Sequence, residues 1–198
     1  MRKVLHVGCG QATIANMTPG FQDGSWEEIR FDINPDARPD IVGTITDMVA
    51  VESDSVDAVY SSHNLEHVYA HEVPRVLAEF RRVIKPEGFA VVTCPDLESV
   101  AAHIAAGKLA DPLYQSPAGP ISPLDILYGH GAAIARGETY MAHRTGFTRK
   151  TLQENAALAG FASLGVRHRP TYFDLWLVAT KQPSAKDSIV DLMTRFCR

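Results

Sequence analysis

Short runs with the character of buried strands recur along the first half of the chain, each bounded by turn residues. Residues 4–7, 26–32, 40–43, 55–60 and 89–94 are these runs, and we expect a strand at each. Before the fifth run, apolar side chains recur on one face of residues 72–84, which predicts an amphipathic helix. A strand, a helix and a further strand in this order form a right-handed parallel unit, so the pattern predicts an α/β protein.

Farther along, residues 152–158 predict another helix, and residues 162–169 and 173–181 predict two closely spaced strands. The connection around Pro170 leaves no room for a crossover helix, so these two strands are expected to form an antiparallel hairpin. Nicotinamide-dependent Rossmann enzymes usually continue with parallel units, and the hairpin therefore disfavours that class. Residues 11–25, in contrast, show only weak helical periodicity, which predicts a short or irregular first crossover.

The first strand ends in two glycines, Gly8 and Gly10, with Cys9 between them. Glycine accepts the positive φ of a tight turn and leaves the backbone open to a ligand. In an open α/β sheet, ligands bind in the crevice beyond the carboxyl ends of the strands. Two glycines without a third fit a plain structural turn as well as they fit a nucleotide site.

Two acidic residues follow at the same expected edge of the sheet. Asp32 ends the second strand 22 residues after Gly10, close to the spacing of about 20 at which doubly wound folds place a carboxylate on a ribose. The alternative is that Asp32 caps the turn at Asn34 and Pro35. Asp47 either bonds an adenine amine or begins the next turn.

Together these motifs resemble the class I S-adenosylmethionine-dependent methyltransferases, and most closely the small group labelled type 11. The resemblance rests on Val4-Leu-His-Val-Gly-Cys-Gly10, Asp32, Asp47, Asp57-Ala-Val-Tyr-Ser-Ser-His-Asn-Leu-Glu-His67 and Arg82-Val-Ile-Lys-Pro-Glu-Gly88, and it resumes at residues 148–181. It implies a Rossmann-like, seven-stranded, mostly parallel sheet with an antiparallel C-terminal hairpin and helices on both faces. It also implies S-adenosyl-L-methionine as the cofactor.

The resemblance further implies which residues contact the cofactor. The backbone at Gly8 and Gly10 would approach the methionyl part, Asp32 would hold the ribose hydroxyls, and Ile33 would pack on adenine. The implied contacts are Gly8, Cys9, Gly10, Asp32, Ile33, Asp47, Met48, Ser61 and Ser62.

Histidines supply the candidate general bases, since an oxygen or nitrogen acceptor must lose a proton to a group titrating near neutrality. His63 is the first candidate because it lies nearest the end of the fourth strand. His63, His67 and His71 recur every four residues with Glu66 among them, a spacing that could hold a metal on a continuous helix. The alternative is a packing and capping segment after the strand, and we predict no metal.

Residues 111–147 depart from the family pattern and are rich in prolines, glycines and aromatic residues. Such an insertion is either a lid over the acceptor pocket or a dimer contact. His130 and His143 within it are further candidate bases. For each, the alternative is a structural histidine bonded to a backbone carbonyl.

The 198-residue length fits one methyltransferase domain, residues 1–181, followed by a tail, residues 182–198, with a short helix that docks on the sheet or on another subunit. The net charge of −4 without a basic cluster indicates no nucleic-acid partner. No apolar stretch is long enough to span a bilayer, and the three scattered cysteines indicate reduced thiols in a cytoplasmic protein.

The sequence therefore predicts a cytoplasmic methyltransferase that acts on an oxygen or nitrogen of a small-molecule or saccharide-like acceptor, with a homodimer left open. A non-catalytic cofactor-binding or interaction protein of the same fold is the alternative, motivated by the weak first helix.

Overall fold

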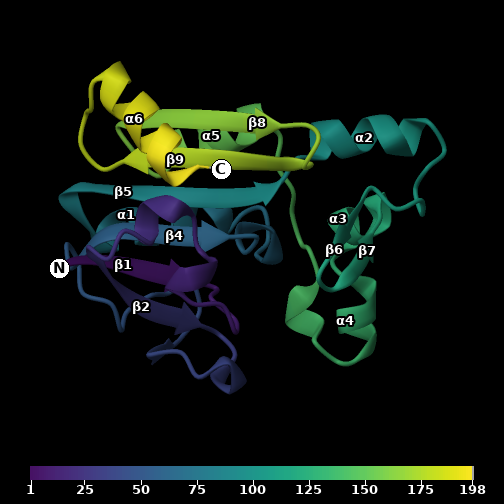
Figure 1. Cartoon of the computed structure of the whole chain (residues 1–198), viewed down its shortest axis with the longest axis horizontal. Coiled ribbons are helices and arrows are strands. Elements are labelled where there is room, and N and C mark those ends of the chain that lie inside the picture. The colour runs from purple at the N-terminus through teal and green to yellow at the C-terminus, as the bar shows by residue number, and fades with distance from the viewer. Residues whose placement is uncertain (198) are drawn as a thin grey trace.

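A seven-stranded sheet forms the centre of the molecule (Figure 1). The computed structural model describes residues 1–197. The strand order is β3-β2-β1-β4-β5-β9-β8, and β9 alone runs antiparallel to its neighbours, as the predicted fold class requires. The strands are β1 (Arg2–Val7), β2 (Trp26–Asp32), β3 (Ile41–Val42), β4 (Val56–Ser62), β5 (Ile84–Pro95), β8 (Ser163–Arg169) and β9 (Asp174–Thr180).

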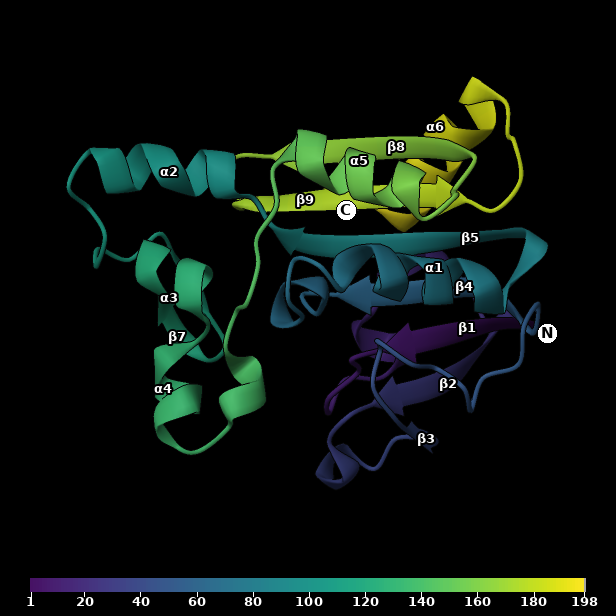
Figure 2. The ribbon, with the colours of Figure 1, turned by 180° about the vertical axis from the view of Figure 1, so that it is seen from behind.

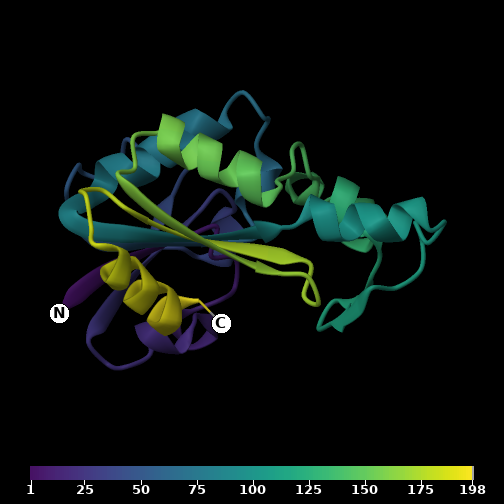
Figure 3. The same cartoon turned by 90° about the horizontal axis from the view of Figure 1, so that it is seen from above.

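Helices cover both faces of this sheet (Figure 3). On one face lie α1 (Val73–Val83) and α5 (Arg149–Leu158), and on the other lies α6 (Lys186–Phe196). α2 (Leu97–Ala105) extends away from the end of β5 (Figure 2). No helix within residues 1–197 has the length and apolarity needed to cross a membrane.

Successive residues of each central strand pack on opposite faces, because side chains alternate across a sheet. In β1, Leu5 and Val7 join the core under α1, whereas Val4 joins the core under α6. The same division separates Val59 from Tyr60 in β4. Residues buried on both faces give the continuous apolar runs from which the sequence predicts these strands.

The first crossover contains two short 3-10 turns, η1 (Ile14–Asn16) and η2 (Pro19–Phe21), where a full helix would cover the sheet. The irregular crossover predicted from residues 11–25 is therefore correct. α6 packs into the space beside these turns: Phe196 lies 4.6 Å from Phe21 and 5.9 Å from Trp26 between ring centroids. The sequence left two docking positions open for this helix, and in the structure α6 packs on the sheet. Arg198, the end of the expected tail, lies outside the described residues.

The insertion forms a small lobe beside the carboxyl edge of the sheet (Figure 1). It contains β6 (Tyr114–Ser116) and β7 (Gly119–Ile121) as a separate hairpin, α3 (Pro123–Tyr128), α4 (Gly131–Ala135) and the 3-10 turn η5 (Thr139–Met141). The chain then returns to the main sheet along residues 138–145, which we call the insertion arm. Hydrogen bonds from the Arg144 and Thr145 amides to the Glu66 carbonyl, at 2.8 and 3.2 Å, attach this arm to the loop after β4.

Candidate functional site

A cavity of about 550 Å³ opens at the carboxyl ends of β1, β2 and β4. The loops after these strands form three of its sides, and the insertion arm forms a fourth. Its lining residues are Gly8, Gly10, Gln11, Phe31, Asp32, Ile33, Asn34, Ala37, Gly43, Thr44, Ile45, Thr46, His63, Asn64, His67, Val68, Glu72, Glu138, Tyr140, Met141 and Arg144. This is the edge at which α/β sheets bind ligands.

The turn after β1, residues 8–10, is shaped by its two glycines. Gly8 and Gly10 have φ values of +63° and +51°, a region that side chains with a Cβ rarely adopt. A Cβ on Gly8 would also lie 2.4 Å from Cγ of Asn64, so the turn can press against the loop after β4 only with glycine. A Cβ on Gly10 would meet nothing within 4 Å, which leaves that backbone open to a ligand.

Asp32 joins this turn to the loop after β2. The Gly10 amide donates to Oδ2 of Asp32 at 2.7 Å, and the Asn34 amide donates to Oδ1 at 2.8 Å. Asp32 therefore caps the turn at Asn34, as the alternative predicted. A carboxylate offers about four lone-pair positions, so two remain for a ligand hydroxyl. Asp32 is 8% exposed and lines the cavity.

Arg30, two residues before Asp32 in β2, holds the same region, and no sequence pattern identifies it. Its guanidinium donates to the carbonyls of Gly10 at 2.6 Å, Ala37 at 3.1 Å and Arg38 at 2.9 Å. These acceptors are backbone groups, so no residue pattern in the sequence marks them as partners. Arg30 thereby fixes the turn after β1 against the loop after β2.

On the side expected to face adenine, Ile33 is 59% exposed and lines the cavity. Asp47 and Met48 are not among the lining residues, contrary to the expected adenine edge. Met48 is buried in the core, and the Asp47 carboxylate points to Arg75 at 4.0 Å. The chain turns inward after residue 46, and Thr44, Ile45 and Thr46 form this wall instead.

Cys9, Ser61 and Ser62 also lie off the cavity lining. β4 continues to Ser62, so both serines are strand residues rather than loop residues. Ser61 is buried, and the hydroxyl of Ser62 lies 3.0 Å from that of Thr93. Cys9 is buried too, and burial raises the pKa of its thiol. The residues that follow β4, His63 and Asn64, reach the cavity in their place.

His63 lies on the cavity wall in a left-handed backbone conformation, with φ at +49°. Its Nδ1 is 3.5 Å from Oε1 of the buried Glu66. Desolvation favours the neutral ring, but the Glu66 carboxylate outweighs it and raises the pKa of His63 above its usual value.

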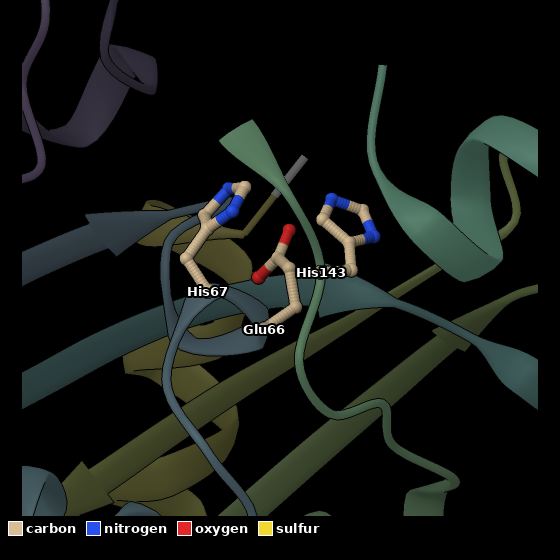
Figure 4. Close-up of side chains that lie close together, drawn as sticks. All are labelled: Glu66, His67 and His143. Carbon is tan, nitrogen blue, oxygen red and sulfur yellow. The ribbon is translucent and has the colours of Figure 1, made fainter. Parts of the chain in front are cut away.

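Among the other histidines, His143 and His67 pack together, with ring centroids 4.9 Å apart. Each ring has its Nδ1 at a backbone carbonyl: His143 at Ile126, 2.7 Å away, and His67 at Ala142, 3.2 Å away. The structural alternative for His143 is thus observed. This contact uses only Nδ1, so Nε2 has no part in it. His130 precedes α4, and neither His130 nor His143 lines the cavity. Figure 4 shows Glu66 between the rings of His67 and His143.

The insertion arm lines the cavity with Glu138, Tyr140, Met141 and Arg144. The Asn34 side chain donates to the Tyr140 hydroxyl at 3.2 Å and so connects the arm to the loop after β2. The Arg144 guanidinium stacks over Tyr69 at 4.7 Å and also lines the cavity. The insertion therefore contributes directly to the ligand space.

These residues fit an adenosyl cofactor. The exposed backbone at Gly10, the remaining lone pairs of Asp32 and the exposed apolar side chain of Ile33 match a backbone-contacted tail, a ribose and a purine ring, respectively. The fold and this cavity are those that the resemblance to the S-adenosylmethionine-dependent methyltransferases implies.

Comparison with protein families agrees with this class: residues 5–92 match the family described as a methyltransferase domain. Over these 88 of the 198 residues, the match confirms the resemblance predicted from the sequence motifs, and with it the assignment as a methyltransferase and the S-adenosylmethionine cofactor that the resemblance implies. No curated protein matches the chain in sequence.

Solved structures of low sequence identity share the fold. A protein of Pyrococcus horikoshii is 18% identical with a TM-score of 0.61, over 91% of this chain and 82% of its own. A SAM-dependent methyltransferase of Methanosarcina mazei is 15% identical with a TM-score of 0.61, over 92% and 93%. An O-methyltransferase family protein of Burkholderia thailandensis is 12% identical with a TM-score of 0.59, over 93% and 52%.

Proposed function

We propose that the protein transfers a methyl group from S-adenosylmethionine to an oxygen or nitrogen of a small-molecule acceptor, with saccharide hydroxyls among the candidates. The observation that carries the proposal is that two sets of residues line one cavity. Gly10, Asp32 and Ile33 come from the turns after β1 and β2, whereas His63, His67 and Arg144 come from the loop after β4 and from the insertion arm. We assign the cofactor to the first set and the acceptor to the second, and we call these the cofactor end and the acceptor end of the cavity.

When bound, the cofactor supplies the methyl carbon and a neutral thioether leaving group. The chain has to hold the acceptor in line with that carbon and exclude water, which in well-oriented systems lowers the barrier by about 7 to 11 kcal/mol. The insertion arm serves as the lid of this space, because Tyr140 and Arg144 lie on its cavity side.

His63 is the proposed general base, since its side chain lines the cavity at the acceptor end. It would take the acceptor proton as the new bond to carbon forms. His143 and His130 are weaker candidates for this role because neither lines the cavity, and Nδ1 of His143 also contacts the Ile126 carbonyl.

The acceptor is proposed as a small molecule because the cavity is bounded by the insertion arm and carries no run of basic residues. The name of the Burkholderia relative favours an oxygen acceptor. A cytoplasmic location belongs to the proposal as well, supported by three free, buried cysteines.

Detection of S-adenosylhomocysteine formed in the presence of hydroxyl-bearing and amine-bearing acceptors tests the proposal. We expect acceptor-dependent product with at least one class and a markedly lower rate in His63→Gln. The non-catalytic alternative, which the short 3-10 turns after β1 favour, predicts cofactor binding without product in any arm.

A further inference from the structure

Three potential metal ligands from two distant parts of the chain meet beside the cavity (Figure 4). Glu66 and His67 belong to the 3-10 turn η4 (Leu65–His67), and His143 comes from the insertion arm. One ligand atom from each of the three lies within 4.8 Å of the other two. A tetrahedral ion with bonds of about 2.1 Å holds its ligand atoms about 3.4 Å apart. Small rotations about the side-chain bonds are enough to bring the three ligand atoms to that spacing.

Both imidazoles are oriented as metal-bound histidines usually are. The Nδ1 atoms of His67 and His143 lie at the Ala142 and Ile126 carbonyls. A carbonyl can only accept a hydrogen bond, so each Nδ1 carries the proton and each ring is the Nδ1–H tautomer. That tautomer leaves the Nε2 lone pair of each ring free to bind an ion. A backbone carbonyl holding the other ring nitrogen is the second-shell arrangement typical of metal sites.

The Glu66 carboxylate lacks the hydrogen bonds that a buried acid requires. Its side chain is 1% exposed, and within residues 1–197 neither oxygen accepts a hydrogen bond. The nearest basic nitrogen, Nδ1 of His63, is 3.5 Å from Oε1, beyond a good charge-assisted contact. A buried carboxylate that has one long ion pair and no hydrogen bond is poorly compensated for the loss of water, so a further group that the chain does not supply is expected to bind it.

We propose that Glu66, His67 and His143 bind a divalent first-row metal ion, with Zn²⁺ as the representative probe. Two imidazoles and one carboxylate are a set that zinc and non-haem iron accept, and this set leaves at least one coordination position open. Since His67 also lines the cavity, the open position is available to a water or to an acceptor oxygen there. That last role rests on the proposed methyl transfer, whereas the binding of the ion does not.

The test uses the full-length chain without a histidine tag, freed of metal with a chelator and dialysed. Titration with Co²⁺ is expected to give one ion per chain and the visible d–d absorption of a nitrogen and oxygen site. No thiolate charge-transfer band is expected, because the three cysteines are buried and outside the cluster. Calorimetric titration with Zn²⁺ should give the same stoichiometry.

Two substitutions identify the ligands. Glu66→Gln keeps the size of the side chain and removes its charge, and His143→Gln removes one imidazole. Each is expected to weaken Zn²⁺ binding at least tenfold while the metal-free protein stays folded. The thermal unfolding midpoint of metal-free Glu66→Gln is expected to be no lower than that of the metal-free parent, because the substitution removes a buried charge. His71→Gln is the matched control: this exposed histidine is stacked on Tyr69, is not one of the three ligands and should leave binding unchanged.

The proposal is overturned if the parent binds neither Co²⁺ nor Zn²⁺ stoichiometrically, or if Glu66→Gln and His143→Gln bind as the parent does. The first of these results would mean that a protonated His63 alone compensates Glu66. A parallel titration with S-adenosylmethionine in chelator separates the two proposals. Cofactor binding without metal binding removes only the ion, and metal binding without cofactor binding removes only the methyl transfer.

Discussion

At the scale of single residues, the carboxylate of Asp32 has two roles at one position. It accepts the amides of Gly10 and Asn34, and it keeps lone pairs toward the cavity. Spacing along the chain was enough to single out Asp32, because the strand that precedes it and the glycine turn end at one sheet edge. Arg30 and the cluster at Glu66 could not be predicted in the same way, since their partners come together only through the tertiary fold.

Substitution of Asp32 by Asn should weaken the binding of S-adenosylmethionine by about 1 to 3 kcal/mol. The amide keeps the size of the side chain but offers fewer acceptor positions, so the Gly10 amide and the ribose hydroxyls cannot all be satisfied. Calorimetric titration measures the change. Equal affinities of Asp32→Asn and the parent would remove this carboxylate from the cofactor site.

His63→Gln should lower kcat by about 10²- to 10⁴-fold, the usual contribution of a general base. Its dissociation constant for S-adenosylmethionine should stay within about threefold of the parent value, since His63 is assigned to the acceptor end. Steady-state kinetics combined with cofactor titration distinguishes this role from a structural one. A variant that turns over at the parental rate would contradict the assignment.

At the scale of elements, an ion pair on α1 holds the loop that follows the cavity wall. Arg82 pairs with Glu79 at 2.7 Å and also donates to the carbonyls of Met48 and Val51, each at 2.9 Å. These bonds fix the loop that follows the cavity wall at residues 44–46. The amphipathic pattern of residues 72–84 predicted the buried face of this helix correctly, but its polar face gave no sign of which loop it would hold.

Glu79→Gln should lower the free energy of unfolding at neutral pH by roughly 1 to 3 kcal/mol. The hydrogen bond from Arg82 holds the pKa of Glu79 below its ordinary value of 4.5. A lowered pKa in the folded state stabilises the protein above the unfolded value, and this contribution is lost as the pH falls through the folded value. Denaturation of both proteins between pH 7 and pH 3 should therefore show the difference shrinking in acid, and a constant difference would exclude the ionised carboxylate as its source.

At the scale of the whole molecule, α6 takes over the sheet face that the short first crossover leaves uncovered. Phe196 is 1% exposed and meets Phe89 at 4.7 Å as well as the aromatic residues of the first crossover. The strand patterns predict the strands and the terminal hairpin, and the resemblance to the methyltransferases implies the seven-stranded sheet that they form. The position of α6 could not be predicted, because an amphipathic helix at the end of a chain fits the sheet or a partner equally well.

Phe196→Ala should destabilise the protein by about 3 to 5 kcal/mol through loss of buried surface and creation of a cavity. Val190→Ala on the exposed side of the same helix, where Val190 is 54% exposed, is the matched control and should have little effect. Chemical denaturation gives both values. Similar small losses in the two variants would mean that α6 does not contribute to the core.

The central claim is that the cavity at Gly10, Asp32 and Ile33 binds S-adenosylmethionine, and calorimetric titration of the parent protein tests it most directly. The account predicts saturable binding of S-adenosylmethionine and of S-adenosylhomocysteine with one site per chain, and no binding of NAD. Binding of NAD without binding of either sulfur-containing ligand would contradict it.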